Sequence, residues 1–172
     1  MIKNLDITVT VNGKRRNVSI PPRLLLSDFI RHHIGLPGTH VGCEHGVCGC
    51  CNVLFNGKAM RSCLMFAVQA DGAEITTVEA FGTAAKLHPI QEAFWEEHGL
   101  QCGFCTPGML VSALDLLRTN PTPTREEATE AISGNLCRCT GYQNIINAIM
   151  SAADKMKAAD VVPEKLEARA AS

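Results

Sequence analysis

The chain has 172 residues and a hydrophobic fraction of 46%, which suits one ordinary domain or two small domains with packed cores. Its formal net charge is -1 and it carries no basic stripe, so neither a nucleic acid nor an anionic membrane is expected as its partner. No apolar run approaches the ~18 residues of a membrane-spanning helix, so no such span is predicted.

The nine cysteines are the most informative feature of the composition. The first residues, MIKNLDITVTV, contain no apolar signal region and no small-residue cleavage site, so a cytoplasmic location is predicted. Disulfides are rare in that compartment, and the cysteines are therefore expected to be metal ligands. A metal site also suits domains of fewer than about 80 residues, which bury a modest share of their surface.

The first half of the chain predicts a compact α+β unit, the domain that we assign to residues 1–80. Two stretches of alternating residues surround Asn12-Gly13 and Asn56-Gly57, which are pairs typical of tight hairpin turns. Between them, leucine, isoleucine and phenylalanine recur at helical spacing. In chain order the expected elements are a hairpin (5–20), a helix (24–36), a cysteine loop (35–51), a second hairpin (51–66) and a strand (73–80).

The second half loses this alternation and predicts an all-helical domain over residues 81–157. Pro107 suits the first turn of a helix, and Thr124 with the acidic residues after it is typical of a capped start. The helices are expected at residues 88–98, 107–119, 124–133 and 141–157. Residues 158–172 form an alanine- and charge-rich tail, expected to be a frayed helix or a strap on a partner.

Four cysteines of the first half have the spacing of a plant-type ferredoxin cluster site. Cys43, Cys48 and Cys51 form a C-x4-C-x2-C motif, and Cys63 is expected on the strand after the next turn. Two irons need four thiolates, so a loop must surround the cluster from several sides. Structural zinc is the alternative, although it is usually bound by two C-x2-C knuckles, which the x4 gap fits poorly.

Three glycines and a surplus cysteine complete the loop. Gly42, Gly46 and Gly49 are expected to let backbone N–H groups approach the cluster sulfurs, which tunes the reduction potential. Cys50 competes with Cys51 as a ligand, but Cys51 completes the x2 spacing, and adjacent side chains entering a strand point in opposite directions. Cys50 is therefore interpreted as a small buried residue.

Two further cysteine pairs each lie just before a predicted helix. Helix N-termini present unpaired N–H groups and a partial positive charge, which suits an anionic cluster. A second four-thiolate site is therefore predicted, with structural zinc as a serious alternative. A redox dithiol at CGFC is disfavoured because the surrounding βαβ pattern is missing. The four cysteines are Cys102 and Cys105 in QCGFCTPGM, and Cys137 and Cys139 in GNLCRCTGY.

Taken together, GCEHGVCGCC with the later SC, QCGFCTPGM and GNLCRCTGYQNI resemble one known family in their order and spacing. This family is the small iron–sulfur subunit of the molybdenum hydroxylases, which are similar to xanthine dehydrogenase and include aerobic carbon monoxide dehydrogenase. The resemblance covers nearly the whole chain, and its motifs are specific in combination. The chain departs from the family pattern at Cys50, where a small non-cysteine residue is usual, and at Asn52, where threonine is common.

The resemblance implies a β-grasp ferredoxin-type domain followed by a four-helix bundle, each holding one [2Fe–2S] cluster. Gln101 resembles the glutamine that hydrogen-bonds the molybdopterin cofactor, and Cys139 would lie beside that pterin. By the same motifs the first cluster would be bound by Cys43, Cys48, Cys51 and Cys63, and the second by Cys102, Cys105, Cys137 and Cys139.

The resemblance also implies an electron-transfer subunit of an oxidoreductase complex, with no substrate site on this chain. A large partner subunit would carry molybdopterin cytosine dinucleotide with molybdenum, and a medium subunit would carry FAD, in a dimer of heterotrimers. Electrons would pass singly from molybdenum through the helical-domain cluster and the ferredoxin-domain cluster to flavin, because two-electron chemistry must be divided. A stand-alone two-cluster ferredoxin and a structural zinc protein are the alternatives.

The remaining polar and aromatic residues give less specific predictions. The six histidines are expected on the surface or around the clusters, since four cysteines already serve each cluster. Phe94 and Trp95 are interpreted as core residues of the first helix in the second half. The glutamate pairs at 96–97 and 126–127 are interpreted as solvated helix positions.

Overall fold

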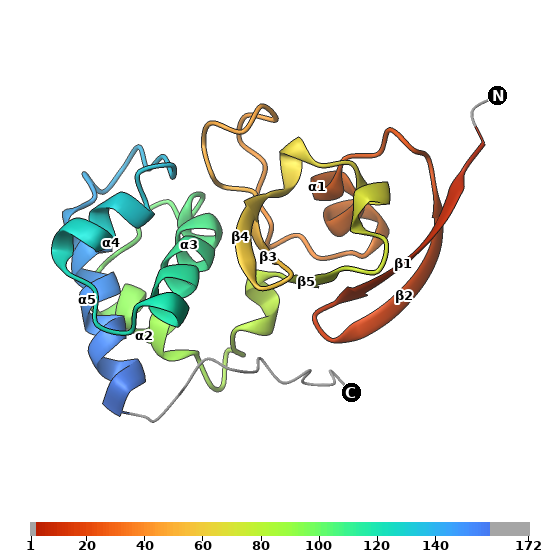
Figure 1. Ribbon diagram of the computed structural model, residues 1–172. Coiled ribbons are helices and arrows are strands. Elements are labelled where there is room, and N and C mark those ends of the chain that lie inside the picture. Colours follow the sequence, from red (N-terminus) through yellow and green to blue (C-terminus); the bar gives the residue numbers. More distant parts are fainter. Residues whose placement is uncertain (1–2, 159–172) are drawn as a thin grey trace.

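The computed structural model describes residues 3–158, so the tail predicted at 158–172 lies outside the described residues apart from Ala158. Figure 1 shows the sheet with its short helical turns on one side of the molecule and the four longer helices on the other. The chain has a mixed sheet and a ferredoxin-like first half, which confirms the predicted α+β class. Within residues 3–158, no helix has the length and apolar character needed to cross a membrane.

The sheet has five strands in the order β2-β1-β5-β3-β4. They are β1 (Leu5–Val11), β2 (Lys14–Ile20), β3 (Asn52–Phe55), β4 (Lys58–Arg61) and β5 (Glu74–Thr76). β1 pairs with β5 in parallel, and the other neighbours are antiparallel. Both predicted hairpins are confirmed. Asn12, Gly13, Asn56 and Gly57 all have positive φ, the geometry that matches a tight turn to the twist of its two strands.

The helix predicted at 24–36 is present but shorter, and half of it is π-helical. α1 (Leu26–Asp28) continues directly into the π-helical turn Phe29–His33. Gly35, with φ of +81°, follows the last turn and ends it as predicted. The buried residues of this segment pack against the sheet in a first core, which includes Val9, Leu26, Phe29, Ile30 and Ile75.

The strand predicted to carry Cys63 ends too early, so that prediction was wrong. β4 stops at Arg61, and Cys63 lies on a 3-10 turn, Ser62–Leu64. The Ser62 N–H and hydroxyl both donate to the Cys51 carbonyl, over 3.3 and 2.8 Å. The backbone bond continues the β3–β4 ladder by one residue pair, and the chain then leaves the sheet in the turn that the Met65 N–H closes on the Ser62 carbonyl. Two more 3-10 turns follow, Ala67–Ala70 and Val78–Ala80.

All four helices predicted in the second half are present. They are α2 (Pro89–Glu96), α3 (Thr106–Thr119), α4 (Arg125–Ala131) and α5 (Gln143–Ala158). The predicted cap of α4 is confirmed, because Thr124 Oγ1 accepts the Glu127 N–H over 3.2 Å and the Glu127 carboxylate accepts the Thr124 N–H over 2.7 Å. α5 packs against α2 and α4, and α3 packs against α4 and β3.

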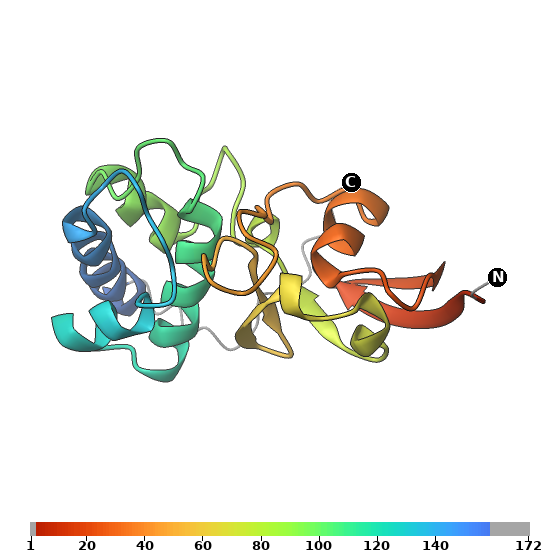
Figure 2. The same cartoon turned by 90° about the horizontal axis from the view of Figure 1, so that it is seen from above.

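The two halves meet at β3, which contributes to both hydrophobic cores. Val53 belongs to the core beneath the sheet, whereas its neighbour Leu54 belongs to the core of the helices, since successive strand residues point to opposite faces. Cys48 and Cys50 of the cysteine loop also belong to the core of the helices. Figure 2 shows this loop between α3 and the rest of the sheet half. The loop is therefore part of the boundary between the halves.

Candidate iron–sulfur sites

The first cysteine set lies on the loop before β3 and on the turn after β4. Two of its predicted glycines lie close to side chains that an added Cβ would press against. A Cβ at Gly42 would lie 3.1 Å from Cys48 Sγ, and one at Gly46 would lie 2.5 Å from the Leu64 side chain. Gly46 also has φ of +80°, which side chains other than glycine rarely adopt. Glycine therefore allows the loop to close tightly around its thiols.

The four thiols of the first set form two pairs. The Cys48 thiol affects the pKa of Cys43, and the Cys51 thiol affects that of Cys63, so each pair consists of neighbouring thiols. The backbone N–H of Cys48, with that of His45 next in effect, lowers the pKa of Cys43 to about 6. Burial, followed by the Cys51 thiol, raises the pKa of Cys63 to about 12. The loop itself thus stabilises one thiolate, whereas Cys63 needs the positive charge of a bound metal to lose its proton.

The second cysteine set joins the start of α3 to the segment before α5. Cys105 is the N-cap residue of α3, and Pro107 lies in the first turn, as predicted. Cys102 and Cys139 affect each other's pKa, as do Cys105 and Cys137, so each pair of neighbouring thiols takes one cysteine from each motif. Burial, more than the neighbouring thiols, raises the pKa of Cys105 to about 12.

Two residues that the sequence motifs did not point to, Thr140 and Tyr142, form hydrogen bonds with Cys137. Thr140 Oγ1 lies 3.1 Å from Cys137 Sγ, and the Thr140 N–H donates to the same sulfur over 3.5 Å. Tyr142 Oη accepts the Cys137 N–H over 2.9 Å. Burial raises the pKa of Cys137, but the hydrogen bonds from Thr140 outweigh it and lower the pKa overall. The threonine three residues after the cysteine in CRCTGY was the available signal, because threonine often bonds nearby groups.

The pairing of the thiols tests which metal centre the two sets fit. Four zinc ligands surround one point, whereas a two-iron cluster takes two thiolates on each iron. Among the residues that the structure describes, no three His, Cys, Asp or Glu side chains surround a single-ion position. Each predicted ligand has a neighbouring thiol of its own set, and four thiols in each set supply the donors that two irons require. The residues present therefore fit one [2Fe–2S] cluster at each set.

Comparisons with known proteins agree with this fit. The family model described as 2Fe-2S iron-sulfur cluster binding domain matches residues 9–77, and the model described as [2Fe-2S] binding domain matches residues 77–150. The nicotine 6-hydroxylase small subunit of Paenarthrobacter nicotinovorans is 55% identical over 148 residues, which are 86% of this chain and 89% of that protein. Caffeine dehydrogenase subunit gamma of Pseudomonas sp. strain CBB1 is 56% identical over 149 residues, 84% of this chain and 89% of that protein.

A solved structure extends the match to three dimensions. A chain in the crystal structure of quinoline 2-oxidoreductase from Pseudomonas putida 86 has a TM-score of 0.87 and 49% identity, and the match covers 91% of this chain and 98% of that one. This chain belongs to the small iron–sulfur subunits of the molybdenum hydroxylase family. The resemblance inferred from the cysteine motifs is confirmed.

Replacing Thr140 with valine is expected to lower the reduction potential of the second cluster of this subunit. The Thr140 hydroxyl lies 3.1 Å from Cys137 Sγ, and a hydrogen bond to sulfur stabilises the more negative reduced form. Losing a bond of about 1 kcal/mol shifts a one-electron potential by on the order of 50 mV. Redox titration followed by EPR measures the shift. Thr140→Ser, which keeps the hydroxyl, should retain the potential; an unchanged valine variant would show that this hydroxyl does not tune the cluster.

Cys50 is the ninth cysteine of the subunit, and it neighbours Cys48 of the first set. It is 3% exposed and lies in the core of the helices with Cys48 and Cys105. Its thiol donates to the Cys48 carbonyl, with a sulfur–oxygen distance of 3.8 Å. Burial, followed by the hydrogen bond with Cys48, raises the pKa of Cys50 to about 12. A thiol that stays protonated near neutral pH behaves as a small buried residue, in keeping with the interpretation from the sequence.

The two cysteine sets of the subunit differ in exposure. Cys48, Cys51 and Cys63 of the first set are buried, whereas Cys102 and Cys139 of the second set are exposed. Gln101, which precedes the second set, is exposed as well. Large exposed apolar side chains mark contact surfaces when they gather near a site. Such side chains occur beside both sets in sequence: Val47 and Leu64 for the first, Phe104 and Leu136 for the second.

The aromatic residues of α2 divide between core and surface. Phe94 is 1% exposed, as predicted, but Trp95 is 71% exposed, so its interpretation as a core residue is wrong. Adjacent residues of a helix point in directions about 100° apart, and α5 packs on the side that Phe94 faces. Glu96 is exposed as predicted, and it pairs with Lys155 over 2.9 Å.

The histidines of the subunit have local roles. His40 Nδ1 lies 2.8 Å from the Phe104 carbonyl, and its ring stacks on the Phe104 ring. His45 Nδ1 contacts the Cys43 carbonyl within the first ligand loop. His88 caps α2 by accepting the Ile90 N–H over 3.2 Å, and burial lowers its pKa, which favours the neutral ring that can accept.

Proposed function

We propose that this chain is the electron-relay subunit of a molybdenum-containing hydroxylase or dehydrogenase complex. The observation that carries the proposal is the arrangement of eight thiols in two sets that lie next to each other. A backbone hydrogen bond links the loop of the first set directly to the segment of the second. The Leu136 N–H, beside Cys137, donates to the carbonyl of Cys48 over 2.9 Å. When bound, each [2Fe–2S] cluster takes up and releases one electron. Two linked sites can therefore divide two-electron chemistry into single transfers.

We assign the ligands and the domains accordingly. The separate hydrophobic cores support a β-grasp ferredoxin-type domain at residues 1–80 and a four-helix bundle at 81–157, with a tail at 158–172. The thiol pairs support the ligand sets. The first cluster is assigned to Cys43, Cys48, Cys51 and Cys63, and the second to Cys102, Cys105, Cys137 and Cys139.

Electrons are proposed to enter at the second set, which is the more exposed one. A large partner subunit would present molybdopterin cytosine dinucleotide with its molybdenum there, where Gln101 and Cys139 are accessible. A medium subunit with FAD would receive electrons from the first set, in a cytoplasmic dimer of heterotrimers. The names of the relatives, a small subunit and a subunit gamma, support an assembly of several chains.

Metal analysis and co-purification test the proposal. Two clusters require about four irons and four acid-labile sulfides per chain, with visible absorption. Colourless protein that holds zinc and no sulfide would exclude the relay. Co-elution with a flavoprotein and a molybdenum-containing chain is expected. A fully loaded and stable monomer that elutes alone would instead favour a stand-alone two-cluster ferredoxin.

Gln101→Ala is expected to leave both clusters in place but to slow the delivery of electrons from molybdenum. Gln101 is exposed next to Cys102, so its amide is free to bond a partner's cofactor without holding the fold together. Stopped-flow reduction of the clusters by substrate in the complex measures the change. Gln143→Ala, at an exposed glutamine of α5, is the control. Unchanged cluster reduction in Gln101→Ala would contradict the pterin contact.

A further inference from the structure

A buried chain of polar side chains crosses from the sheet to the helices between the two cysteine sets. Asn52 of β3 donates from Nδ2 to Ser112 Oγ of α3 over 2.8 Å. Ser112 Oγ donates to Asn135 Oδ1 over 2.9 Å, and Asn135 Nδ2 donates to the Gly49 carbonyl over 3.2 Å. The chain thus starts just after the first ligand loop and returns to the loop itself.

These three side chains are almost inaccessible to water. Asn52, Ser112 and Asn135 are 7%, 6% and 3% exposed. Burying amides and hydroxyls gives little net stability, because each internal hydrogen bond mainly offsets a bond lost to water. A buried polar network can instead select one arrangement of the groups that it joins. Here the network joins three segments that are far apart in sequence.

The backbones that the network joins are already in close contact. A Cβ at Gly108 of α3 would lie 2.2 Å from the Gly49 carbonyl oxygen, and a Cβ at Gly49 would lie 2.6 Å from the Gly134 carbonyl oxygen. Arg61 of β4 also donates to the Gly134 carbonyl over 2.8 Å. The first ligand loop is therefore held between the start of α3 and the segment that leads to Cys137.

We propose that Ser112 and Asn135 are positioning residues that fix the separation of the two cysteine sets for electron transfer between their clusters. This inference rests on the proposed function. Asn135 precedes Leu136, whose N–H donates to the Cys48 carbonyl over 2.9 Å. The network therefore controls a bonded link from Cys48 to the residue before Cys137. One electron leaves the second site as it enters the first, so the transfer balances with no further reactant.

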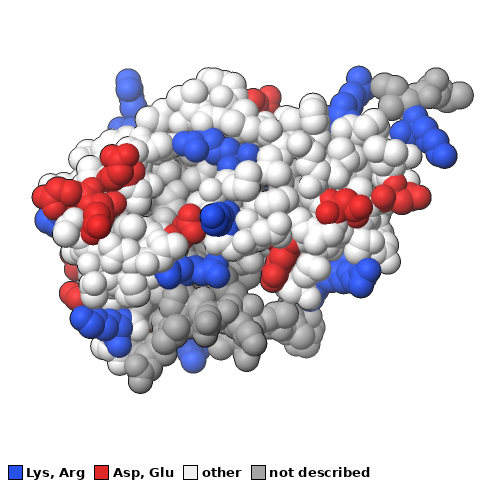
Figure 3. Space-filling model, in the orientation of Figure 1, with Lys and Arg blue, Asp and Glu red and all other residues white. Residues whose placement is uncertain are grey.

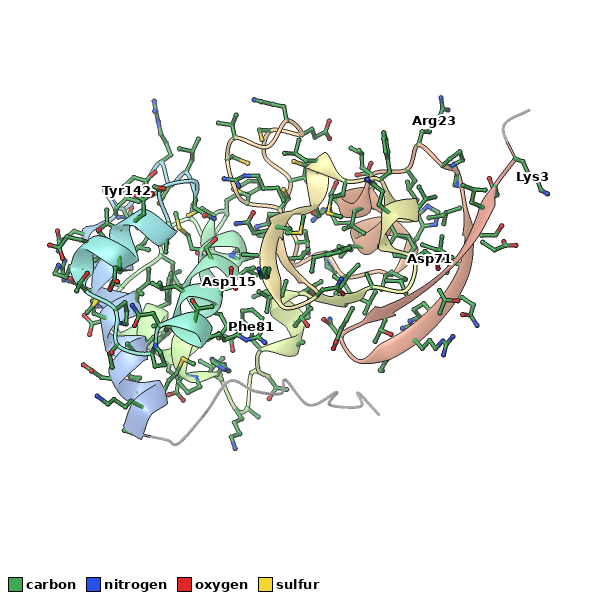
Figure 4. All side chains as sticks on the ribbon, in the orientation of Figure 1. Lys3, Arg23, Asp71, Phe81, Asp115 and Tyr142 are labelled. Carbon is green, nitrogen blue, oxygen red and sulfur yellow. The ribbon has the colours of Figure 1, made fainter. Side chains whose placement is uncertain are left out.

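A cavity borders one side of the network. The cavity has a volume of about 410 Å³, and Asn52, Arg61, Asp115 and Asn135 are among the residues that line it. Figure 3, in the orientation of Figure 1, shows acidic and basic side chains close together in the middle of the visible face. Figure 4 shows Asp115 between the helices and the sheet. Because side chains do not fill this space, the hydrogen bonds of the network act together with the backbone contacts at Gly49 and Gly108 to hold the alignment.

The test uses two variants that cut the network and two matched controls, all in the assembled complex. Asn135→Leu keeps the approximate size of the side chain but removes its bonds to Ser112 and Gly49. Ser112→Ala removes the central hydroxyl, and Ser112→Thr keeps it. Asn147→Leu makes the same exchange on α5, away from the network, where the Asn147 side chain accepts hydrogen bonds from Arg125 and Gln143.

Three measurements report the positions of the two sites. The splitting of the EPR signals when both clusters are reduced depends on their separation and needs no turnover. Asn135→Leu and Ser112→Ala are expected to change this splitting and to increase amide hydrogen exchange at residues 43–51 and 132–137. They should also change the rate of electron transfer between the clusters by severalfold, because tunnelling depends steeply on the separation of the two centres. Both control variants should match the wild type.

Unchanged splitting and transfer rate in Asn135→Leu and Ser112→Ala would overturn the proposal and show that the network serves stability alone. If Asn135→Leu does not fold, Ser112→Ala, which removes a single hydroxyl, decides the matter. Iron and sulfide analysis separates this outcome from failure of the proposed function. Wild-type protein with about four irons supports the two-cluster relay whatever the variants do to the splitting.

Discussion

The Cys51→Ser variant is expected to lose one of the two clusters, so that its iron content falls from about four to about two per chain. Cys51 is 1% exposed, and its thiol pairs with that of Cys63. A serine hydroxyl cannot replace the soft thiolate that iron–sulfur clusters select, and the buried site offers no water-exposed alternative. Iron and acid-labile sulfide analysis, together with visible absorption, measures the loss.

Cys50→Ala is the matched control, because Cys50 is the next residue and is equally buried. The Cys50→Ala variant is expected to retain about four irons. In the wild type the Cys50 thiol donates to the Cys48 carbonyl, and burial keeps it protonated near neutral pH, so it is not expected to be an iron ligand. Half the iron in Cys50→Ala together with full iron in Cys51→Ser would reverse the ligand assignment. Full iron in both would mean that the loop can exchange one thiol for the other.

A single methyl group at Gly108 is expected to disrupt the contact between the two halves. Glycine to alanine within a helix normally stabilises by about 1 kcal/mol. At Gly108 the added Cβ would lie 2.2 Å from the Gly49 carbonyl oxygen and 2.9 Å from Cys50 Cα, and neither backbone atom can rotate away. The helix or the ligand loop must shift, so Gly108→Ala is expected to destabilise the subunit by about 1–3 kcal/mol. Thermal unfolding followed by circular dichroism and by cluster absorption measures this change.

Gly72→Ala provides the control for the added methyl group. No atom lies within 4 Å of a Cβ built at Gly72, and its φ of +73° gives strain from the backbone alone. The expected cost is about 1 kcal/mol, and both clusters should keep their wild-type EPR splitting. A Gly108→Ala variant as stable as the wild type would contradict the close approach of α3 to the first ligand loop.

Local chemistry explains which elements the sequence could predict. Asn-Gly pairs adopt positive φ readily, so both hairpins were predictable from Asn12-Gly13 and Asn56-Gly57. The start of α4 was predictable because the Thr124 cap is formed within one helical turn. In each case the residues that decide the structure lie next to one another in the chain.

The predictions that failed depended on distant contacts. Cys63 leaves the strand because the segment after it pairs with the start of α1: the Leu26 N–H donates to the Met65 carbonyl, and the Ala67 N–H donates to the Leu24 carbonyl. Trp95 is exposed because the position of α5 determines which face of α2 is buried, and the residues of α2 alone do not reveal that position.

The amino-acid sequence by itself predicted two sets of four cysteines with Cys50 left over, because the spacing within each motif is local. Only the tertiary structure decided that the two later motifs lie side by side, and that Asn52, Ser112 and Asn135 form one buried chain between the sets. The physical reason is that spacing constrains neighbours along the backbone. Contacts between remote segments depend instead on how the helices and the sheet pack against each other.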